Sequence, residues 1–250
     1  GMRVGGTGAP VDPVVTAFAG GTVYLSGTTA ISGTAQLTFT ASSVVPTYAN
    51  TYSGTTVVTG GVLAVGSASI SPPGGVLVNG DILVNNAAMQ VALPGLLASS
   101  STLAILAGGS FTLSSGNQTL DRILFTNDGG TTTPLISGGT LMLRSGSIFA
   151  FNDNFATTPT ISSSLEMGGL PLFVLTSGAS PDGLILSGVI RNSIGGTSAP
   201  LLKSGSGALV LTGSNTFTGG VQLYAGALIV GASAALGVGS LTVIEGSLLS

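Results

Sequence analysis

Short runs of alternating apolar and polar residues recur along the chain, and glycine-rich turns separate them. Within 207–213 the alternation puts Leu209 and Leu211 on one face, and Leu228 and Val230 have the same spacing. A period of two residues is typical of β-strands with one buried face. Glycine pairs mark the turns, because tight corners need backbone angles that other residues adopt only at a cost. The pattern predicts an all-β chain of short strands. Further apolar pairs with this spacing are Phe111 with Leu113, Leu141 with Leu143, Leu184 with Leu186, Val221 with Leu223 and Leu241 with Val243.

One part of the pattern occurs twice without a gap, at 50–66 and again at 215–231. The matching positions are Asn50 with Asn215, Tyr52 with Phe217, Gly54 with Gly219, Gly61 with Gly226, Leu63 with Leu228 and Val65 with Val230. Repetition of a short glycine–strand unit indicates an array of stacked units.

Two architectures fit a string of short strands: a β-sandwich with hairpin connections and a parallel β-solenoid. The gapless repeat and the small residues at the corners favour the solenoid. At about 20–25 residues per coil the chain would form roughly ten coils, a rod of about 50 Å. We expect one elongated domain over 1–250, a segment of a longer protein, with repeat copies near 50–84 and 201–250. Residues 117–160 are predicted to be the least regular part, with a longer loop around 149–155.

The composition supports a folded chain and excludes several classes of protein. Hydrophobic residues make up 44% and charged residues only 5%, where an ordinary domain has about 25% charged residues. No apolar run approaches the roughly 18 residues of a membrane-spanning helix. The net charge of −3, with Lys203 as the sole lysine, argues against nucleic-acid binding.

Catalytic, cofactor-binding and metal-ligating residues are not predicted anywhere in the chain. There is no His and no Cys, which removes the commonest general base and the usual zinc ligands. The eight acidic residues are scattered singly, mostly beside Gly, Asn or Pro, so turn and solubility roles are expected. Asn152-Asp153-Asn154 offers oxygen ligands for calcium but lacks the usual acidic spacing. Lys203 and Arg144 could act as bases, as in β-helical polysaccharide lyases, which are similar only in architecture.

Residues 201–250 resemble the autotransporter-associated β-strand repeat, also called the passenger-associated transport repeat. The resemblance implies a right-handed parallel β-helix on a bacterial surface, exported through an outer-membrane translocator that lies outside this chain. It also implies that Lys203 is the repeat lysine near a coil corner. The upstream copy fits less fully. The structural repeat positions are Lys203, Gly205, Gly207, Leu209, Leu211, Asn215, Phe217, Gly219, Gly226 and Leu228, with Asn50, Tyr52, Gly54, Gly61 and Leu63 in the upstream copy.

Two kinds of repeat position have expected structural roles. The amides of Asn50 and Asn215 are expected to bond turn backbone or to stack on neighbouring coils. Tyr52 and Phe217 are expected to pack at corners.

Several positions that the alternation places outward are apolar. A row of them along a solenoid would form a patch, and large apolar patches mark partner surfaces. Another layer of the same chain could equally cover such a row. The candidate self-association face consists of Leu124, Met142, Ile185, Val210, Ile229 and Ile244.

The sequence therefore predicts a non-enzymatic structural protein of the bacterial cell surface or extracellular matrix, a stalk or adhesin segment similar to an autotransporter passenger. An alternative is a self-assembling extracellular fibre or sheath subunit, with solenoids docked end to end or laterally. A third hypothesis is a carbohydrate-binding or carbohydrate-acting β-helix. The absence of Trp and the small number of Tyr, four, provide few aromatic platforms for it.

Overall fold

The computed structural model describes residues 52–66, 76–193, 196 and 198–244 in full, and the backbone alone of 4–5, 15–19, 22–25, 37–39 and 248–249. All the regular secondary structure within these residues is β-strand. No helix in this part of the chain could cross a membrane. Asn50, one of the predicted repeat positions, lies outside the described residues.

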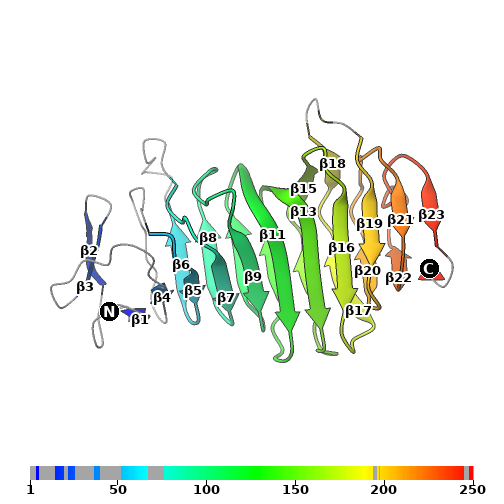
Figure 1. The fold of residues 1–250 in the computed structure, drawn as a ribbon. Helices are drawn as coiled ribbons and strands as arrows, with labels where there is room; N and C mark the ends of the chain where they lie inside the picture. Colours follow the sequence, from blue (N-terminus) through cyan, green and yellow to red (C-terminus); the bar gives the residue numbers. More distant parts are fainter. Residues whose placement is uncertain are drawn as a thin grey trace.

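Two long parallel sheets run side by side along the molecule (Figure 1). Their strands alternate along the chain, so the chain coils from one sheet to the other and back. The strands of the first, which we call the large sheet, are β4 (Leu37–Phe39), β5 (Thr56–Val58), β7 (Ile82–Asn85), β9 (Thr102–Leu106), β11 (Asn117–Asn127), β13 (Thr140–Asn152), β16 (Leu172–Ser177), β19 (Leu201–Ser204), β21 (Val221–Leu223) and β23 (Leu241–Val243). The strands of the second sheet are β6 (Val62–Val65), β8 (Ala88–Val91), β10 (Ser110–Leu113), β12 (Leu135–Ser137), β14 (Thr160–Ile161), β17 (Asp182–Leu186), β20 (Ala208–Leu211), β22 (Ala227–Val230) and β24 (Leu248–Leu249).

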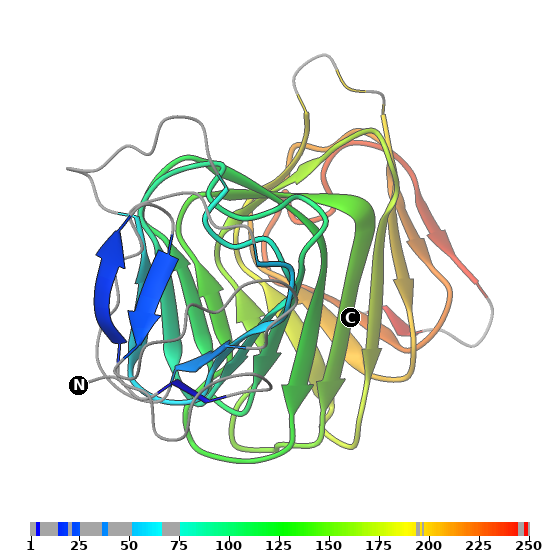
Figure 2. The same ribbon diagram turned by 60° about the vertical axis from the view of Figure 1, so that its left-hand side comes forward.

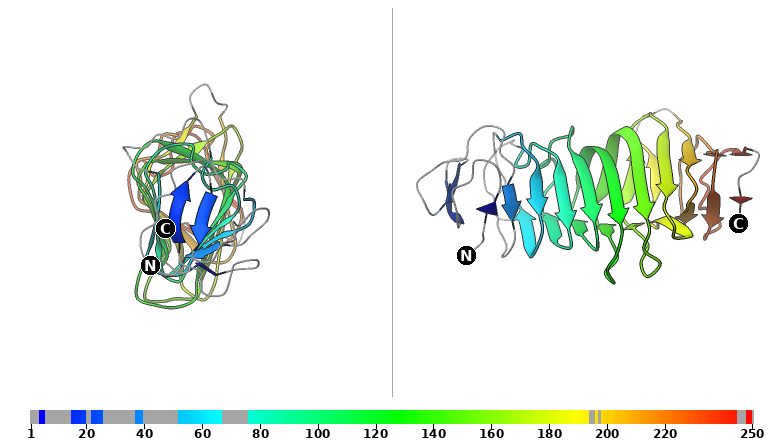
Figure 3. Two further views of the ribbon diagram at one scale, coloured as in Figure 1. Left: turned by 90° about the vertical axis from the view of Figure 1, so that its left-hand side faces the viewer. Right: turned by 60° about the horizontal axis from the view of Figure 1, so that its bottom comes forward.

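A third side closes the central coils, as the view along the axis shows (Figure 3, left). It is formed by the first halves of β11 and β13, by β15 (Ser164–Met167) and by β18 (Ile190–Asn192), which pair in parallel. The β11–β13 register shifts after Leu120, where both strands turn the corner from the third side into the large sheet.

The strands nearest the N-terminus depart from this parallel pattern. β1 (Val4–Gly5) pairs antiparallel with β4. β2 (Val15–Ala19) pairs antiparallel with β3 (Thr22–Leu25), and this pair lies at the N-terminal end of the rod (Figure 2).

The core consists of inward side chains stacked from coil to coil. In the large sheet Leu103, Ile123, Ile148 and Val174 are in register, and each is fully buried. Branched aliphatic side chains suit such stacks because they fill a pleated surface with few rotamers. Burying each one contributes about 1.5–3 kcal/mol. The alternation read from the sequence is therefore the alternation between core and surface.

The predicted parallel β-solenoid is confirmed. The two sequence copies occupy equivalent places in their coils, because β5 and β21 lie in the large sheet and β6 and β22 in the second. The coil count differs from the predicted ten. Among the described residues the second sheet has nine strands, and the large sheet has ten from β4 to β23. Coil length also varies, because 20 residues separate Leu103 from Ile123 but 29 separate Val174 from Lys203.

The prediction that 117–160 is the least regular segment is wrong. This segment contains β11 and β13, which at 11 and 13 residues are the longest described strands. Their alternation is interrupted at Asp121 and at 144–146 because each strand turns a corner there without leaving the ladder.

Candidate functional site

Lys203, near the end of β19, closes a corner between the large and second sheets. It belongs to an inward row, in register with Val174 on one side and Leu223 on the other. Its side chain is completely buried. The Nζ atom donates hydrogen bonds to the carbonyl oxygens of Ser204 at 2.7 Å, Gly205 at 3.0 Å and Ala225 at 3.0 Å. Because Ala225 belongs to the following coil, the lysine ties two coils together.

The backbone around the ammonium group can only be built with glycine. Gly205 and Gly226 have φ angles of +80° and +74°, in the left-handed region. A Cβ atom at Gly226 would lie 2.2 Å from the carbonyl oxygen of Gly205 and 3.0 Å from Nζ of Lys203. These glycines let the carbonyl groups approach the ammonium group closely.

Burial lowers the pKa of Lys203 to about 8. Desolvation penalises the charged form of a buried lysine. No carboxylate in the described part of the chain forms an ion pair with Nζ. The hydrogen bonds that Nζ donates therefore go to backbone carbonyl oxygens. The aliphatic stem packs with the core and the polar tip reaches the corner, as is usual for a buried lysine.

Asn215 links three successive coils. Its Oδ1 atom accepts from the backbone N–H of Ile190 at 2.8 Å, and its Nδ2 atom donates to the carbonyl of Ala235 at 2.5 Å. Phe217, two residues further along the chain, is fully buried. A Cβ at Gly237 would lie only 3.0 Å from its ring.

The upstream copy contains a related corner. Tyr52 is 9% exposed, and its hydroxyl is 2.6 Å from Oγ1 of Thr56. Burial raises the pKa of Tyr52, and the hydrogen bond to Thr56 opposes that rise.

The remaining repeat positions fall into a buried apolar group and a turn group. Buried are Leu63, Leu209, Leu211 and Leu228. The turn positions lie close to neighbouring backbone or have left-handed angles. They are Gly54, whose carbonyl contacts Gly80; Gly61, with φ of +70°; Gly207, against Thr176; and Gly219, against Ala199.

A buried amide cluster in the central coils was not predicted. Asn127 Nδ2 donates to Asn152 Oδ1 at 2.8 Å and to the carbonyl of Thr157 at 2.9 Å. Asn152 Nδ2 donates to the carbonyl of Asp182 at 2.6 Å, and Asn154 Nδ2 donates to Thr157 Oγ1 at 2.9 Å. These amides are occupied with protein partners rather than arranged around an ion. The signal in the sequence is an Asn-Asp pair after an alternating strand, repeated 25 residues later.

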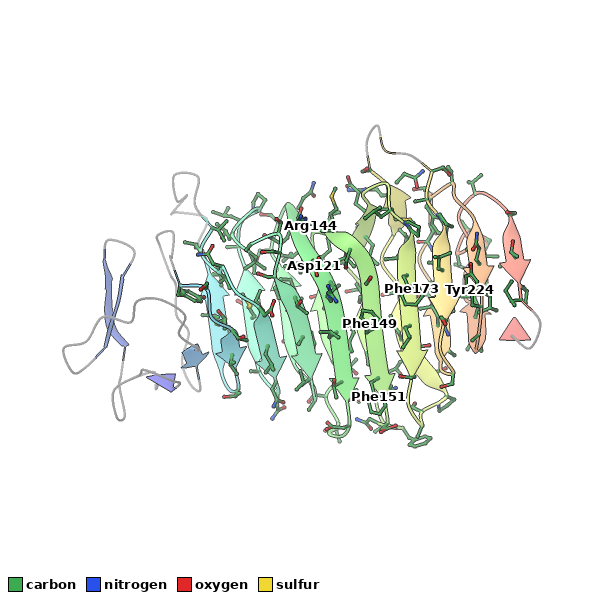
Figure 4. All side chains as sticks on the ribbon, viewed as in Figure 1. Asp121, Arg144, Phe149, Phe151, Phe173 and Tyr224 are labelled. Carbon is green, nitrogen blue, oxygen red and sulfur yellow. The ribbon has the colours of Figure 1, made fainter. Side chains whose placement is uncertain are left out.

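Charged side chains do not gather at one place. Two ion pairs occur among the described residues: Arg122 Nε with Asp121 Oδ2 at 2.8 Å, and Arg191 Nη2 with Glu166 Oε2 at 3.3 Å. The described residues contain no cluster of three or more potential metal ligands. Arg144 is exposed at the corner of β13 (Figure 4).

The predicted self-association residues are outward but are divided among three sides of the rod. Ile185, Val210 and Ile229 are in register on the second sheet. Leu124 lies on the large sheet and Met142 on the third side. Ile244, 42% exposed, follows β23. The structure therefore brings only the first three together.

A groove of about 370 Å³ lies on the outer face of the large sheet. Leu83, Ala104 and Leu124 are neighbours in register along it. Its other lining residues are Thr55, Asp81, Ile82, Thr102, Arg122 and Phe149.

The comparisons with known proteins agree with this geometry. The family profile described as "Passenger-associated-transport-repeat" matches residues 32–65 and 201–230. The second match contains the Lys203 corner and Asn215, and the first contains Tyr52 and Thr56. The two matches and the parallel β-solenoid together support the predicted resemblance to an autotransporter passenger-like repeat protein. No curated protein and no solved structure gives a significant match.

Proposed function

We propose that this chain is a non-enzymatic, rod-like segment of an exported bacterial surface protein, similar to an autotransporter passenger, that serves as a stalk or adhesin scaffold. The translocator would lie outside the chain. One observation carries the proposal. The transport-repeat match at 201–230 includes the corner that Lys203 closes and the asparagine, Asn215, that links neighbouring coils.

A mechanism for export follows from these contacts. In a solenoid each coil contacts only its neighbours, so folding can begin at one coil and continue along the rod. The coil that begins with β19 has a buried lysine, Lys203, and a buried asparagine, Asn215, that both bond the next coil. This coil would therefore be a template on which neighbouring coils stack as the chain emerges from the translocator.

Surface display tests this function. The 250-residue chain would be fused ahead of an outer-membrane translocator barrel and expressed in a bacterial host, and protease treatment of whole cells would measure display. Wild type should be displayed, and Gly95→Ala should be displayed nearly as well, because Gly95 shares the left-handed backbone of Gly226, with φ of +72°, but its new Cβ meets nothing within 4 Å. Gly226→Ala should be displayed poorly, because the new Cβ would collide with the Gly205 carbonyl. Equal display of Gly226→Ala, or no display of wild type, would refute the proposal.

Self-assembly into a fibre or sheath is the second candidate function. It is favoured by the outward apolar residues Ile185, Val210 and Ile229, which stack on the second sheet. Val210→Lys should then abolish assembly while leaving the β-sheet circular dichroism spectrum intact. Continued assembly of that variant, seen by electron microscopy, would exclude this face.

A further inference from the structure

An apolar row runs up the outer face of the large sheet, on different strands from the stack on the second sheet. Leu83, Ala104, Leu124, Phe149 and Leu175 are in register on consecutive strands. The rings of Phe149 and the adjacent outward Phe173 pack edge to face at 6.2 Å. Figure 4 shows both rings and that of Tyr224 on this face.

The same face is almost free of charge. Apart from the corner residues, Arg122 is the only charged outward side chain on the described strands of the large sheet, and it is paired with Asp121. Asp81, directly before β7, also lines the groove, and its Oδ1 atom accepts from the backbone N–H of Thr102 at 2.8 Å. A partner for this face must therefore also be flat, apolar and nearly uncharged, because an unpaired buried charge would be costly. This chain, with 5% charged residues, itself presents such a face.

The two halves of the face have complementary relief. In the N-terminal half, the small side chain of Ala104 lies in the groove of about 370 Å³ between Leu83 and Leu124. In the C-terminal half, Tyr224 protrudes after β21 and is 47% exposed. Its hydroxyl donates to Gln222 Oε1 at 2.8 Å, which holds the ring in place.

We propose that two copies of this chain pack face to face through their large sheets, with the rods antiparallel. Tyr224 of each copy then enters the groove around Ala104 of the other, and the two-fold axis passes between β13 and β16. Such an interface is isologous, so each contact forms twice.

The available area is sufficient for a specific dimer. Eight strand levels, from β7 to β23, extend about 38 Å, and five residues of strand extend about 17 Å. The overlap buries about 650 Å² on each copy, or about 1,300 Å² in total, within the range of stable interfaces.

The first test is the mass of the 250-residue chain in solution, measured by analytical ultracentrifugation over a range of concentrations. Wild type should approach twice the chain mass of 24.2 kDa. Ala104→Lys fills the groove and adds a charge, so it should remain monomeric with an unchanged circular dichroism spectrum. Val210→Lys, a matched outward change on the second sheet, should still dimerise. Monomeric wild type at every concentration, or loss of dimer in Val210→Lys alone, would overturn the proposal.

Single cysteines test the antiparallel register, because the chain has no Cys of its own. Oxidising a mixture of Ala104→Cys and Tyr224→Cys chains should give a cross-linked dimer, whereas neither variant alone should cross-link. Cross-linking of Ala104→Cys with itself would instead indicate parallel rods and would contradict the proposed packing.

Discussion

Replacing Lys203 with Met tests the role of the repeat corner. Methionine keeps the length of the apolar stem but removes the three hydrogen bonds from Nζ to the carbonyls of Ser204, Gly205 and Ala225. Each carbonyl left without a partner costs about 1–3 kcal/mol, with the low end applying here because these residues are only partly buried. The sum of these losses is about 3–4 kcal/mol.

The buried charge acts in the opposite direction. A pKa of about 8 in the folded chain, against about 10.4 in an unfolded one, corresponds to roughly 3 kcal/mol of unfavourable charging at neutral pH. The unfolded chain binds more protons between these two values, so the stability of wild type rises as pH increases from about 8 to 10.4. We therefore expect Lys203→Met to be close to wild type at pH 7 and about 3 kcal/mol less stable above pH 10.

Urea unfolding of both proteins from pH 7 to pH 10.5 measures this difference. The other titrating groups are common to both chains, so the difference reports Lys203 alone. Arg144→Met, which removes an exposed cation, is the matched control and should differ from wild type by less than about 0.5 kcal/mol at every pH. A gap between wild type and Lys203→Met that stays constant or narrows from pH 7 to pH 10.5 would refute the reasoning, because it would mean that the folded chain holds the lysine pKa at or above its usual value.

Other substitutions test the backbone and the coil links. Gly226→Ala should destabilise the fold by about 3 kcal/mol, because left-handed strain is added to overlap with the Gly205 carbonyl. Gly95→Ala, with φ of +72° and open space around the new Cβ, should destabilise it by only about 1 kcal/mol. Equal shifts of the thermal unfolding temperature would contradict the contact argument. Asn215→Leu should cost about 2–4 kcal/mol, because it leaves the N–H of Ile190 and the carbonyl of Ala235 unpaired. Asn117→Leu, at an exposed position, should cost less than about 0.5 kcal/mol in the same urea experiment. A similar loss of stability in Asn215→Leu and Asn117→Leu would show that the Asn215 links between coils do not stabilise the fold.

The sequence was sufficient to predict the strands and the way they stack. Alternation such as Leu209 with Leu211 identifies one buried face of a strand, and the copy of Gly226 at Gly61 identifies equivalent corners. Both signals are local, so they survive variation in the length of each coil. For this reason the solenoid could be predicted without knowing which residues lie above one another.

Contacts between coils were harder to predict because coil length varies. Asn127 lies beneath Asn152 only because 25 residues separate them in that coil, whereas 29 separate Val174 from Lys203. The self-association face predicted from the sequence was limited by a related difficulty. Leu124, Met142 and Ile185 were placed outward by alternation, but alternation does not say which of the three sides a strand occupies.

Electron tomography of the producing cells, with gold-labelled antibody against this chain, tests the assignment as a surface rod most directly. Label on rods that project from the outer membrane is the expected result. Label confined to the cell interior would contradict the proposed export and surface role.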